Sequence, residues 1–311
     1  MAMAMASAMA TVDARDLPAL LQRFPARSVA VGGSGDESGD RVRMQFRQSG
    51  NTAIAPTHVL LHGIGSGSAS WVEQLQAADG SPTCHVLAWD APGYGDSSAL
   101  PGDAPTAGEY ATRMWQWLGA MGLAPDATPI TLVGHSLGCL IAASAARAAP
   151  GRIRQLVLLA PAQGYARASA AERQKKLQDR LDALATLGPL GIAQKRGSAM
   201  LSPHASAAQI AFVQGVMAQV KPHGYTQAAR LLAGGDLLAD LADLANKAQP
   251  ACPVQVASGS ADGITPLAGC QRVAESVNAP FALLGDVGHV CALEAPEAVS
   301  KLIGLLKEPA P

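Results

Sequence analysis

Residues 133–139 read VGHSLGC and place a serine between two glycines at the end of an apolar run. The residues just before them, ITLV (130–133), are β-branched or apolar and predict a buried strand. From Leu137 the chain reads LGCLIAASAARAA, which has helical composition and no breaker between Gly138 and Pro150. Ser136 is therefore expected at a corner where a strand passes directly into a helix.

This corner has the pattern of a nucleophile. Gly134, Ser136 and Gly138 fit G-x-S-x-G, a tight strand-to-helix turn whose small neighbours let the serine oxygen project. The helix that starts at Leu137 would direct a backbone N–H at the corner, where it can stabilise an anion. The alternative is a glycine-flanked turn in which the serine only caps a helix.

Strands and helices alternate on both sides of the corner, which is typical of a mainly parallel sheet with helices on both faces. The expected strands are 27–31, 41–48, 57–63, 84–90, 129–135, 154–162, 252–259 and 280–286. The expected helices outside the insertion are 70–78, 107–122, one from Leu137, 266–277 and 295–308. The fold class expected is α/β.

Between the sixth and seventh strands the strand pattern stops. Residues 163–249 carry only helical signals, beginning with an S-x-x-E capping box at Ser169 and Glu172. The predicted organisation has four parts: an N-terminal leader, partly disordered (1–26), a first core segment (27–162), a helical insertion (163–249) and a second core segment (250–311). Apolar side chains of the insertion suit an apolar or aromatic group: Leu187, Leu190, Ile192, Met200, Leu201, Phe212, Val213 and Met217.

Composition excludes several classes of protein. The 311 residues are 49% hydrophobic and carry a formal net charge of -1, which gives no broad attraction to nucleic acid or to an acidic membrane. No stretch has the ~18 uncharged apolar residues of a membrane span. The five cysteines are scattered and lack a C-x-x-C pair, so we expect buried thiols and no metal site. A small-molecule partner and a cytoplasmic location are expected.

A serine nucleophile needs a base and an acid, and both should follow it in the chain. Asp262 lies in a loop after the seventh strand and His289 in a loop after the eighth, so both are expected at one edge of the sheet. Asp286 is the competing acid, but it is expected on the loop surface. The other histidines are expected to be packed or exposed.

A second donor for an oxyanion is expected from the turn after the third strand. His62-Gly63-Ile64-Gly65 is a turn of mostly small residues that can aim a backbone N–H at the serine oxygen. Gly63 and Ile64 both remain candidates, and Ile64 is favoured. A phosphate loop is the alternative, but the spacing and the lysine of a P-loop are missing.

Together these motifs resemble the α/β-hydrolase fold superfamily. They are HGIGSGSASW, DAPGYGDSS, GHSLG, SGSADGITP and GHVCALEAPE, in the order of the family. The resemblance implies an α/β-hydrolase fold with a helical lid and a triad of Ser136, Asp262 and His289. It also implies an oxyanion hole at Leu137 and the Ile64 region, and no cofactor.

The resemblance also suggests a reaction. The ending GHVCALEAPE is similar to enol-lactonases and carboxylesterases, which implies hydrolysis of an ester or a lactone. The glycine and serine run after His62 is similar to hydrolases of carbon–carbon bonds in ring-cleavage products, but those typically carry tryptophan where this chain has Val290. A ligand receptor, an acyltransferase or a cofactor-free oxygenase on the same fold remains an alternative of another class.

Overall fold

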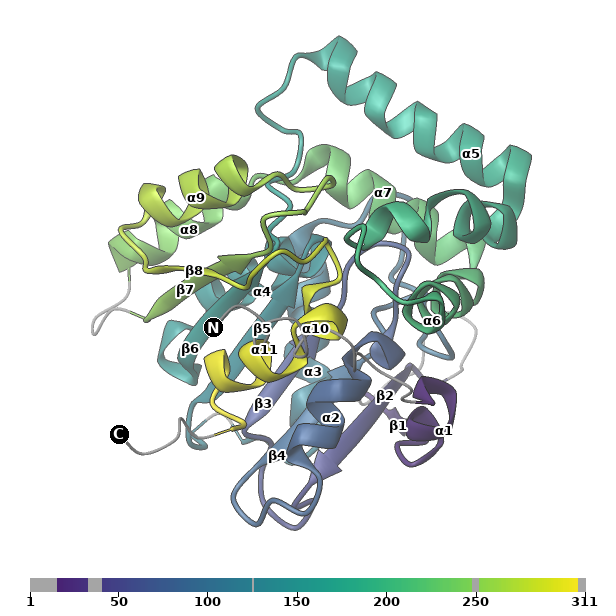
Figure 1. Ribbon diagram of the computed structural model, residues 1–311. Helices are drawn as coiled ribbons and strands as arrows, with labels where there is room; N and C mark the ends of the chain where they lie inside the picture. Colours follow the sequence, from purple (N-terminus) through teal and green to yellow (C-terminus); the bar gives the residue numbers. More distant parts are fainter. Residues whose placement is uncertain (1–15, 33–40, 125, 248–251, 307–311) are drawn as a thin grey trace, which may run out of the picture.

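One twisted sheet organises the molecule. The computed structural model describes residues 16–32, 41–124, 126–247 and 252–306. In these parts of the chain the sheet has eight strands in the order β1-β2-β4-β3-β5-β6-β7-β8 (Figure 1). The strands are β1 (Arg27–Ala30), β2 (Arg43–Gly50), β3 (His58–Leu61), β4 (His85–Trp89), β5 (Ile130–His135), β6 (Ile153–Leu159), β7 (Val254–Ser258) and β8 (Phe281–Leu283).

The sheet is mainly parallel, as the sequence predicts. β1 with β2 and β2 with β4 pair antiparallel, whereas the pairs from β4 onward to β8 are parallel. The central strands β3, β4 and β5 are buried along their whole length, because helices cover both faces of the sheet. This burial is why their sequences read as continuous apolar runs instead of alternating ones.

The helices form two layers around the sheet. On one face α2 contacts α1, α10 and α11, and on the other α4 contacts α3 and α8, with α9 beside α8. Figure 1 shows α2, α10 and α11 in front of the sheet. Their bounds are α1 (Leu17–Gln22), α2 (Val72–Ala78), α3 (Ala107–Ala120), α4 (Leu137–Ala148), α8 (Leu237–Lys247), α9 (Leu267–Ser276), α10 (Cys291–Glu294) and α11 (Pro296–Leu302).

Helix α1 lies inside the segment expected to be a leader. Asp16 caps it by accepting the Ala19 N–H at 3.0 Å. Leu17 and Phe24 are buried in the core, at 2% and 4% exposure. This end of the predicted leader is therefore part of the packed structure, and residues 1–15 lie outside the described residues.

Three further helices connect β6 to the rest of the chain: α5 (Ala170–Arg196), α6 (Ala207–Ala218) and α7 (Pro222–Gly234). In Figure 1 α5 is the farthest of the three from the sheet, and α6 and α7 lie between it and the rest of the molecule. α5 is kinked at Gly188, where φ is 62°. α8 was also expected in the insertion, but it packs on α4, where Arg147 Nε lies 2.9 Å from Asp240 Oδ1.

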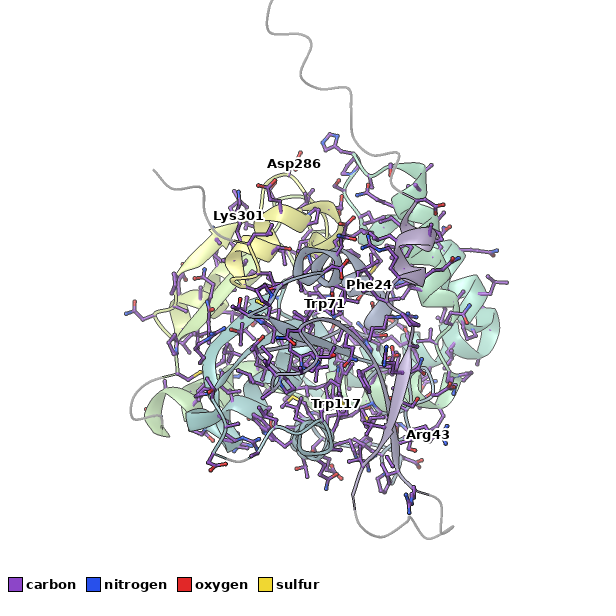
Figure 2. All side chains as sticks on the ribbon, turned by 90° about the horizontal axis from the view of Figure 1, so that it is seen from below. Phe24, Arg43, Trp71, Trp117, Asp286 and Lys301 are labelled. Carbon is purple, nitrogen blue, oxygen red and sulfur yellow. The ribbon has the colours of Figure 1, made fainter. Side chains whose placement is uncertain are left out.

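Aromatic side chains fill the core. Trp89 and Trp117 stack with ring centroids 6.2 Å apart, and Phe46 lies 5.8 Å from Trp117. Figure 2 shows Trp71 and Trp117 in the interior and Asp286 at the periphery. Burial of such rings stabilises the fold through the large apolar area removed from water.

Each helix of the described segments is too short or too polar to span a bilayer.

Candidate active site

Ser136 occupies the turn between β5 and α4 in a strained conformation. Its φ is 53° and its ψ is -116°, outside the region that non-glycine residues favour. The flanking glycines are required by packing: a Cβ on Gly134 would lie 2.7 Å from Cys139 Cα, and one on Gly138 would lie 2.3 Å from the Leu61 carbonyl oxygen. The turn therefore has the geometry that the G-x-S-x-G pattern predicts.

The turn after β3 lies directly against the serine. A Cβ on Gly63 would come within 2.9 Å of Ser136 Cβ, so only glycine fits there without movement. Within the described chain, the backbone N–H groups of Ile64 and Leu137 donate no hydrogen bond, which leaves both available to an oxyanion. The structure thus brings together the two backbone segments that the sequence singles out.

His62 fixes this turn, a role that sequence reasoning missed. Its Nε2 accepts the Ala91 N–H at 3.0 Å, so the ring proton is on Nδ1, which donates to the Gly63 carbonyl at 2.8 Å. Burial lowers the pKa of His62, which favours this neutral form. The ring also packs edge-on against Tyr94, with centroids 4.9 Å apart. His62 therefore links the turn after β3 to the loop after β4.

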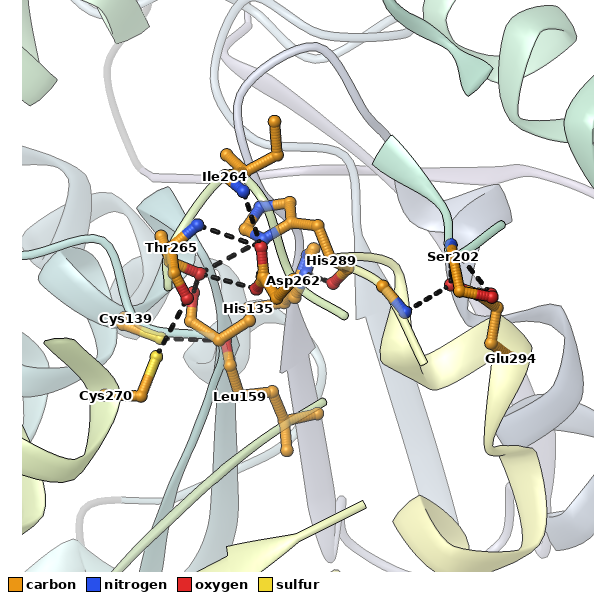
Figure 3. A network of polar contacts seen from close by, with 12 residues as sticks. His135, Cys139, Leu159, Ser202, Asp262, Ile264, Thr265, Cys270, His289 and Glu294 are labelled. Carbon is orange, nitrogen blue, oxygen red and sulfur yellow. Dashed lines mark hydrogen bonds and ion pairs between the residues drawn. The ribbon is translucent and has the colours of Figure 1, made fainter. Parts of the chain in front are cut away.

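Asp262 and His289 form a buried pair at the carboxyl ends of β7 and β8 (Figure 3). His289 Nδ1 lies 2.9 Å from Asp262 Oδ2, and neither side chain is more than 1% exposed. Burial raises the pKa of Asp262, but its hydrogen bond with His289 and its bonds with Thr265 outweigh this and lower it overall. An ionised Asp262 holds the His289 proton on Nδ1 and leaves Nε2 free to accept one.

Thr265 completes the surroundings of the pair. Its hydroxyl lies 2.7 Å from Asp262 Oδ2, 3.2 Å from His289 Nδ1 and 3.1 Å from the Ala160 carbonyl. The backbone N–H groups of Ile264 and Thr265 donate to Asp262 Oδ1 at 2.8 and 2.9 Å. The sequence signal for this arrangement is Asp-x-x-Thr, in which the aspartate caps its own turn.

His135 supports the backbone of the histidine loop. Its Nε2 donates to the His289 carbonyl at 2.7 Å, and the two rings lie 4.8 Å apart. Burial, together with the nearby His289, lowers the pKa of His135 to about 3, so the ring is neutral at physiological pH. The sequence predicts only a packed or exposed histidine here, and the contact of His135 with a residue 154 positions later is visible only in the fold.

Glu294 joins the histidine loop to the helical insertion. Its carboxylate accepts the Gly288 N–H at 2.8 Å, the Ser202 N–H at 3.0 Å and the Ser202 hydroxyl at 2.5 Å (Figure 3). Val290 N–H also donates to the Met200 carbonyl at 3.1 Å. These bonds hold the segment after α5 on the loop that carries His289.

The competing acid lies elsewhere. Asp286 is an exposed loop residue whose carboxylate contacts the exposed His204 at 3.0 Å and the Ser260 hydroxyl at 3.0 Å. This agrees with the expectation of a surface position. His58 and His85 are buried and bonded to backbone carbonyls, of Ile303 at 3.0 Å and Ile54 at 2.8 Å.

Ser136, His289, Gly63 and Ile64 all line one cavity of about 670 Å³, between the sheet and the helical insertion. This volume is in the range of small-molecule sites. Of the apolar residues expected to suit a substrate, the cavity wall includes Ile192, Met200, Phe212, Val213 and Met217. Leu201 is buried in the core instead, and Leu187 and Leu190 are 38% and 60% exposed.

Among the described residues, His, Cys, Asp and Glu side chains form no group of three or more that could hold a metal ion. No cysteine forms a disulfide, and Cys139, Cys252, Cys270 and Cys291 are buried. Ser136 Oγ and His289 Nε2 do not form a hydrogen bond in the described structure. In sites without substrate such bonds are often long and tighten only when substrate binds.

Comparisons with known proteins concern the family and the fold of the chain. The model of the "Alpha/beta hydrolase family" matches residues 59–302. The chain is 28% identical to the (E)-2-((N-methylformamido)methylene)succinate hydrolase of Acinetobacter baylyi over 258 residues, which cover 81% of this chain and 90% of that protein.

Solved structures share the fold, and two of them serve as examples. A malate-bound thermophilic esterase from Thermogutta terrifontis has a TM-score of 0.74 and 22% identity, with coverage of 89% of this chain and 96% of that one. The enol-lactonase from Burkholderia xenovorans LB400 has a TM-score of 0.73 and 20% identity, with coverage of 91% and 100%. At these identities the likeness concerns the fold alone.

Proposed function

Because this chain is a hydrolase that belongs to the alpha/beta hydrolase family, we propose that it cleaves a carboxylic ester or a lactone through an acyl-enzyme on Ser136. The observation that carries the proposal is the buried pair of His289 and Asp262, 2.9 Å apart, of which His289 lines the same cavity as Ser136. A histidine held on one nitrogen by a carboxylate is a base for a nearby serine.

In the first half of the proposed reaction, Ser136 Oγ attacks the carbonyl carbon of the substrate, and His289 Nε2 takes the serine proton. The carbonyl oxygen gains the negative charge. It is bound by the N–H groups of Leu137 and Ile64, which donate no hydrogen bond within the described residues. Each such donor typically contributes about 3 kcal/mol to the transition state.

The tetrahedral species then collapses. The bond to the leaving oxygen breaks, and the protonated His289 gives its proton to that oxygen. Water enters the site, His289 takes a proton from it, and the resulting hydroxide oxygen attacks the acyl carbon. Collapse of the second tetrahedral species returns the proton to Ser136 and releases the carboxylic acid. Asp262 stays ionised and stabilises the cationic form of His289.

We assign the helices α5–α7 the role of a lid over this site. Residues from all three helices line the cavity, among them Ile192, Phe212 and Tyr225. Apolar side chains there would exclude water and select the shape of the acyl or alcohol group. The names of the similar structures, an esterase and an enol-lactonase, support the ester or lactone bond as the target.

The test compares the protein with its Ser136→Ala variant on p-nitrophenyl esters of increasing acyl length. We expect turnover that depends on Ser136, with a burst of nitrophenolate near one equivalent if deacylation is slow. Unchanged turnover in Ser136→Ala would refute the proposal. If neither protein cleaves any ester or enol-lactone but the natural protein cleaves ring-cleavage dienoates, the reaction is carbon–carbon bond hydrolysis and not ester or lactone hydrolysis.

A further inference from the structure

The wall of the cavity that the helical insertion forms is cationic. Lys176, Arg180 and Arg196 of α5 line the cavity, and Arg272 of α9 lines it from the core side. Asp179 is the carboxylate that lines it in the described structure. The protein as a whole has a net charge of -1, so this positive wall does not follow from composition.

The carboxylate of Asp179 is already bound. Lys175 Nζ lies 2.7 and 3.0 Å from its two oxygens. Neither Arg196 nor Arg272 forms an ion pair with any group in the described ranges. Other arginines near the site do: Arg167 Nε lies 2.9 and 2.8 Å from the two oxygens of Asp236. Arg196 and Arg272 are solvent-exposed, and in the described residues their guanidinium groups are not occupied by a carboxylate, whereas that of Arg167 is.

The Tyr165 side chain contacts two of these cations. Lys176 Nζ and Arg180 Cζ lie 5.9 and 5.5 Å from the centre of the Tyr165 ring, on the side that positions i and i+4 of a helix share. The Arg180 guanidinium also donates to the Tyr165 hydroxyl at 3.3 Å. Tyr165 lines the same cavity as these two cations.

A second tyrosine lines the cavity together with Arg180 and Arg196. Tyr225 of α7 is buried at 4% exposure and lines the cavity. Burial raises the pKa of Tyr225, and the positive charges of Arg196 and Arg180 oppose that rise. Arg180 precedes the kink at Gly188 and Arg196 follows it, yet both line the cavity that Tyr225 lines.

We propose that Arg180 and Arg196, assisted by Lys176, bind a carboxylate group of the substrate, so that the natural substrate is an anionic ester or lactone. The guanidinium fork matches a carboxylate with two parallel hydrogen bonds. This inference rests on the proposed function, because it adds a second subsite to the cavity of Ser136. A carboxylate subsite would select anionic esters or lactones, a choice that the apolar lid residues alone do not make.

The test uses two pairs of substrates that differ in charge. Mono-p-nitrophenyl glutarate against p-nitrophenyl valerate places the carboxylate in the acyl part, and 4-acetoxybenzoate against phenyl acetate places it in the leaving group. We expect kcat/KM to favour the anionic member of at least one pair by about 10-fold. Arg196→Gln and Arg180→Gln should each lower that ratio several-fold, and Arg196→Lys should restore part of it.

Arg167→Gln is the matched control, since it removes the same charge from a site outside the cavity, and it should leave the ratio unchanged. Glutarate should inhibit hydrolysis of the neutral ester competitively, and less so in Arg196→Gln. A preference for the neutral ester in both pairs would overturn the inference while Ser136-dependent turnover would still stand. Equal loss of the ratio in Arg167→Gln, or stronger inhibition by inorganic phosphate than by glutarate, would also overturn it.

Discussion

Replacing Asp262 by Asn tests the core of the proposed mechanism. The carboxylate accepts from Ile264 N–H, from Thr265 N–H and hydroxyl, and from His289 Nδ1–H. An amide keeps an oxygen for the two backbone donors. Its NH₂ group then faces His289 Nδ1, which must become the acceptor, so the ring proton moves to Nε2. In that tautomer His289 cannot take the proton of Ser136.

The expected loss in kcat/KM is about 10⁴-fold, the size seen for a wrong histidine tautomer in serine hydrolases. This corresponds to about 5.5 kcal/mol of transition-state stabilisation. The unfolding free energy should fall by only about 1 kcal/mol, since the backbone bonds to the side-chain oxygen persist. Urea unfolding and ester hydrolysis measured on the same preparation separate the two effects.

Asp286→Asn is the control, because Asp286 is an exposed acid on the histidine loop whose partners are His204 and Ser260. Its activity should stay within about twofold of the natural protein, as for most exposed substitutions. If Asp262→Asn lost less than tenfold in activity, or if Asp286→Asn lost as much, Asp262 would not be the residue that orients His289.

Three further predictions follow from named contacts. Thr265→Val removes the hydroxyl 2.7 Å from Asp262 Oδ2 and should lower kcat/KM by about fivefold, whereas Thr265→Ser should recover it; equal losses in both would show a packing role. Gly138→Ala places a Cβ 2.3 Å from the Leu61 carbonyl oxygen and should lower the unfolding free energy by about 2–3 kcal/mol. In the control Gly119→Ala the new Cβ meets no atom within 4 Å, so the unfolding free energy should not fall. Denaturant unfolding of the two variants compares these values. Burial lowers the pKa of His58 to about 4, so the unfolded chain binds a proton that the folded chain does not between about pH 6.5 and 4. Stability should therefore fall by about 2 kcal/mol from pH 7 to pH 5 through this residue, and a slope unchanged in His58→Gln would contradict it.

Local sequence patterns predict much of the fold. Continuous apolar runs predict β3, β4 and β5 because helices bury both faces of these strands. The parallel order then predicts that the loops after β7 and β8 meet at one edge of the sheet. This is why the sequence alone predicts that Asp262 and His289 lie close together. The glycine pattern predicts the corner at Ser136, because only glycine tolerates the close approach of the neighbouring backbone.

The sequence did not distinguish helices that look alike but pack differently. α8 has the same helical signals as α5–α7, yet it covers the sheet beside α4. Periodicity reports that one face of a helix is apolar, and it does not report which surface covers that face. For the same reason α1 was not separated from the leader that precedes it.

The sequence by itself determined the class of the molecule: an α/β sheet, a serine on a sharp corner, and an acid and a histidine in later loops. Each of these follows from spacing along the chain, which local sterics and strand order control. The tertiary structure alone decided which side chains support them and which cations face the cavity. His135 reaches the His289 carbonyl, and Glu294 binds Gly288 and also Ser202, which lies 92 residues away from it in the sequence. Arg196 lines the cavity whereas Arg167 pairs with Asp236, although both are arginines of the same insertion. Such partners lie far apart along the chain, and only the packing of distant segments brings their atoms within bonding distance.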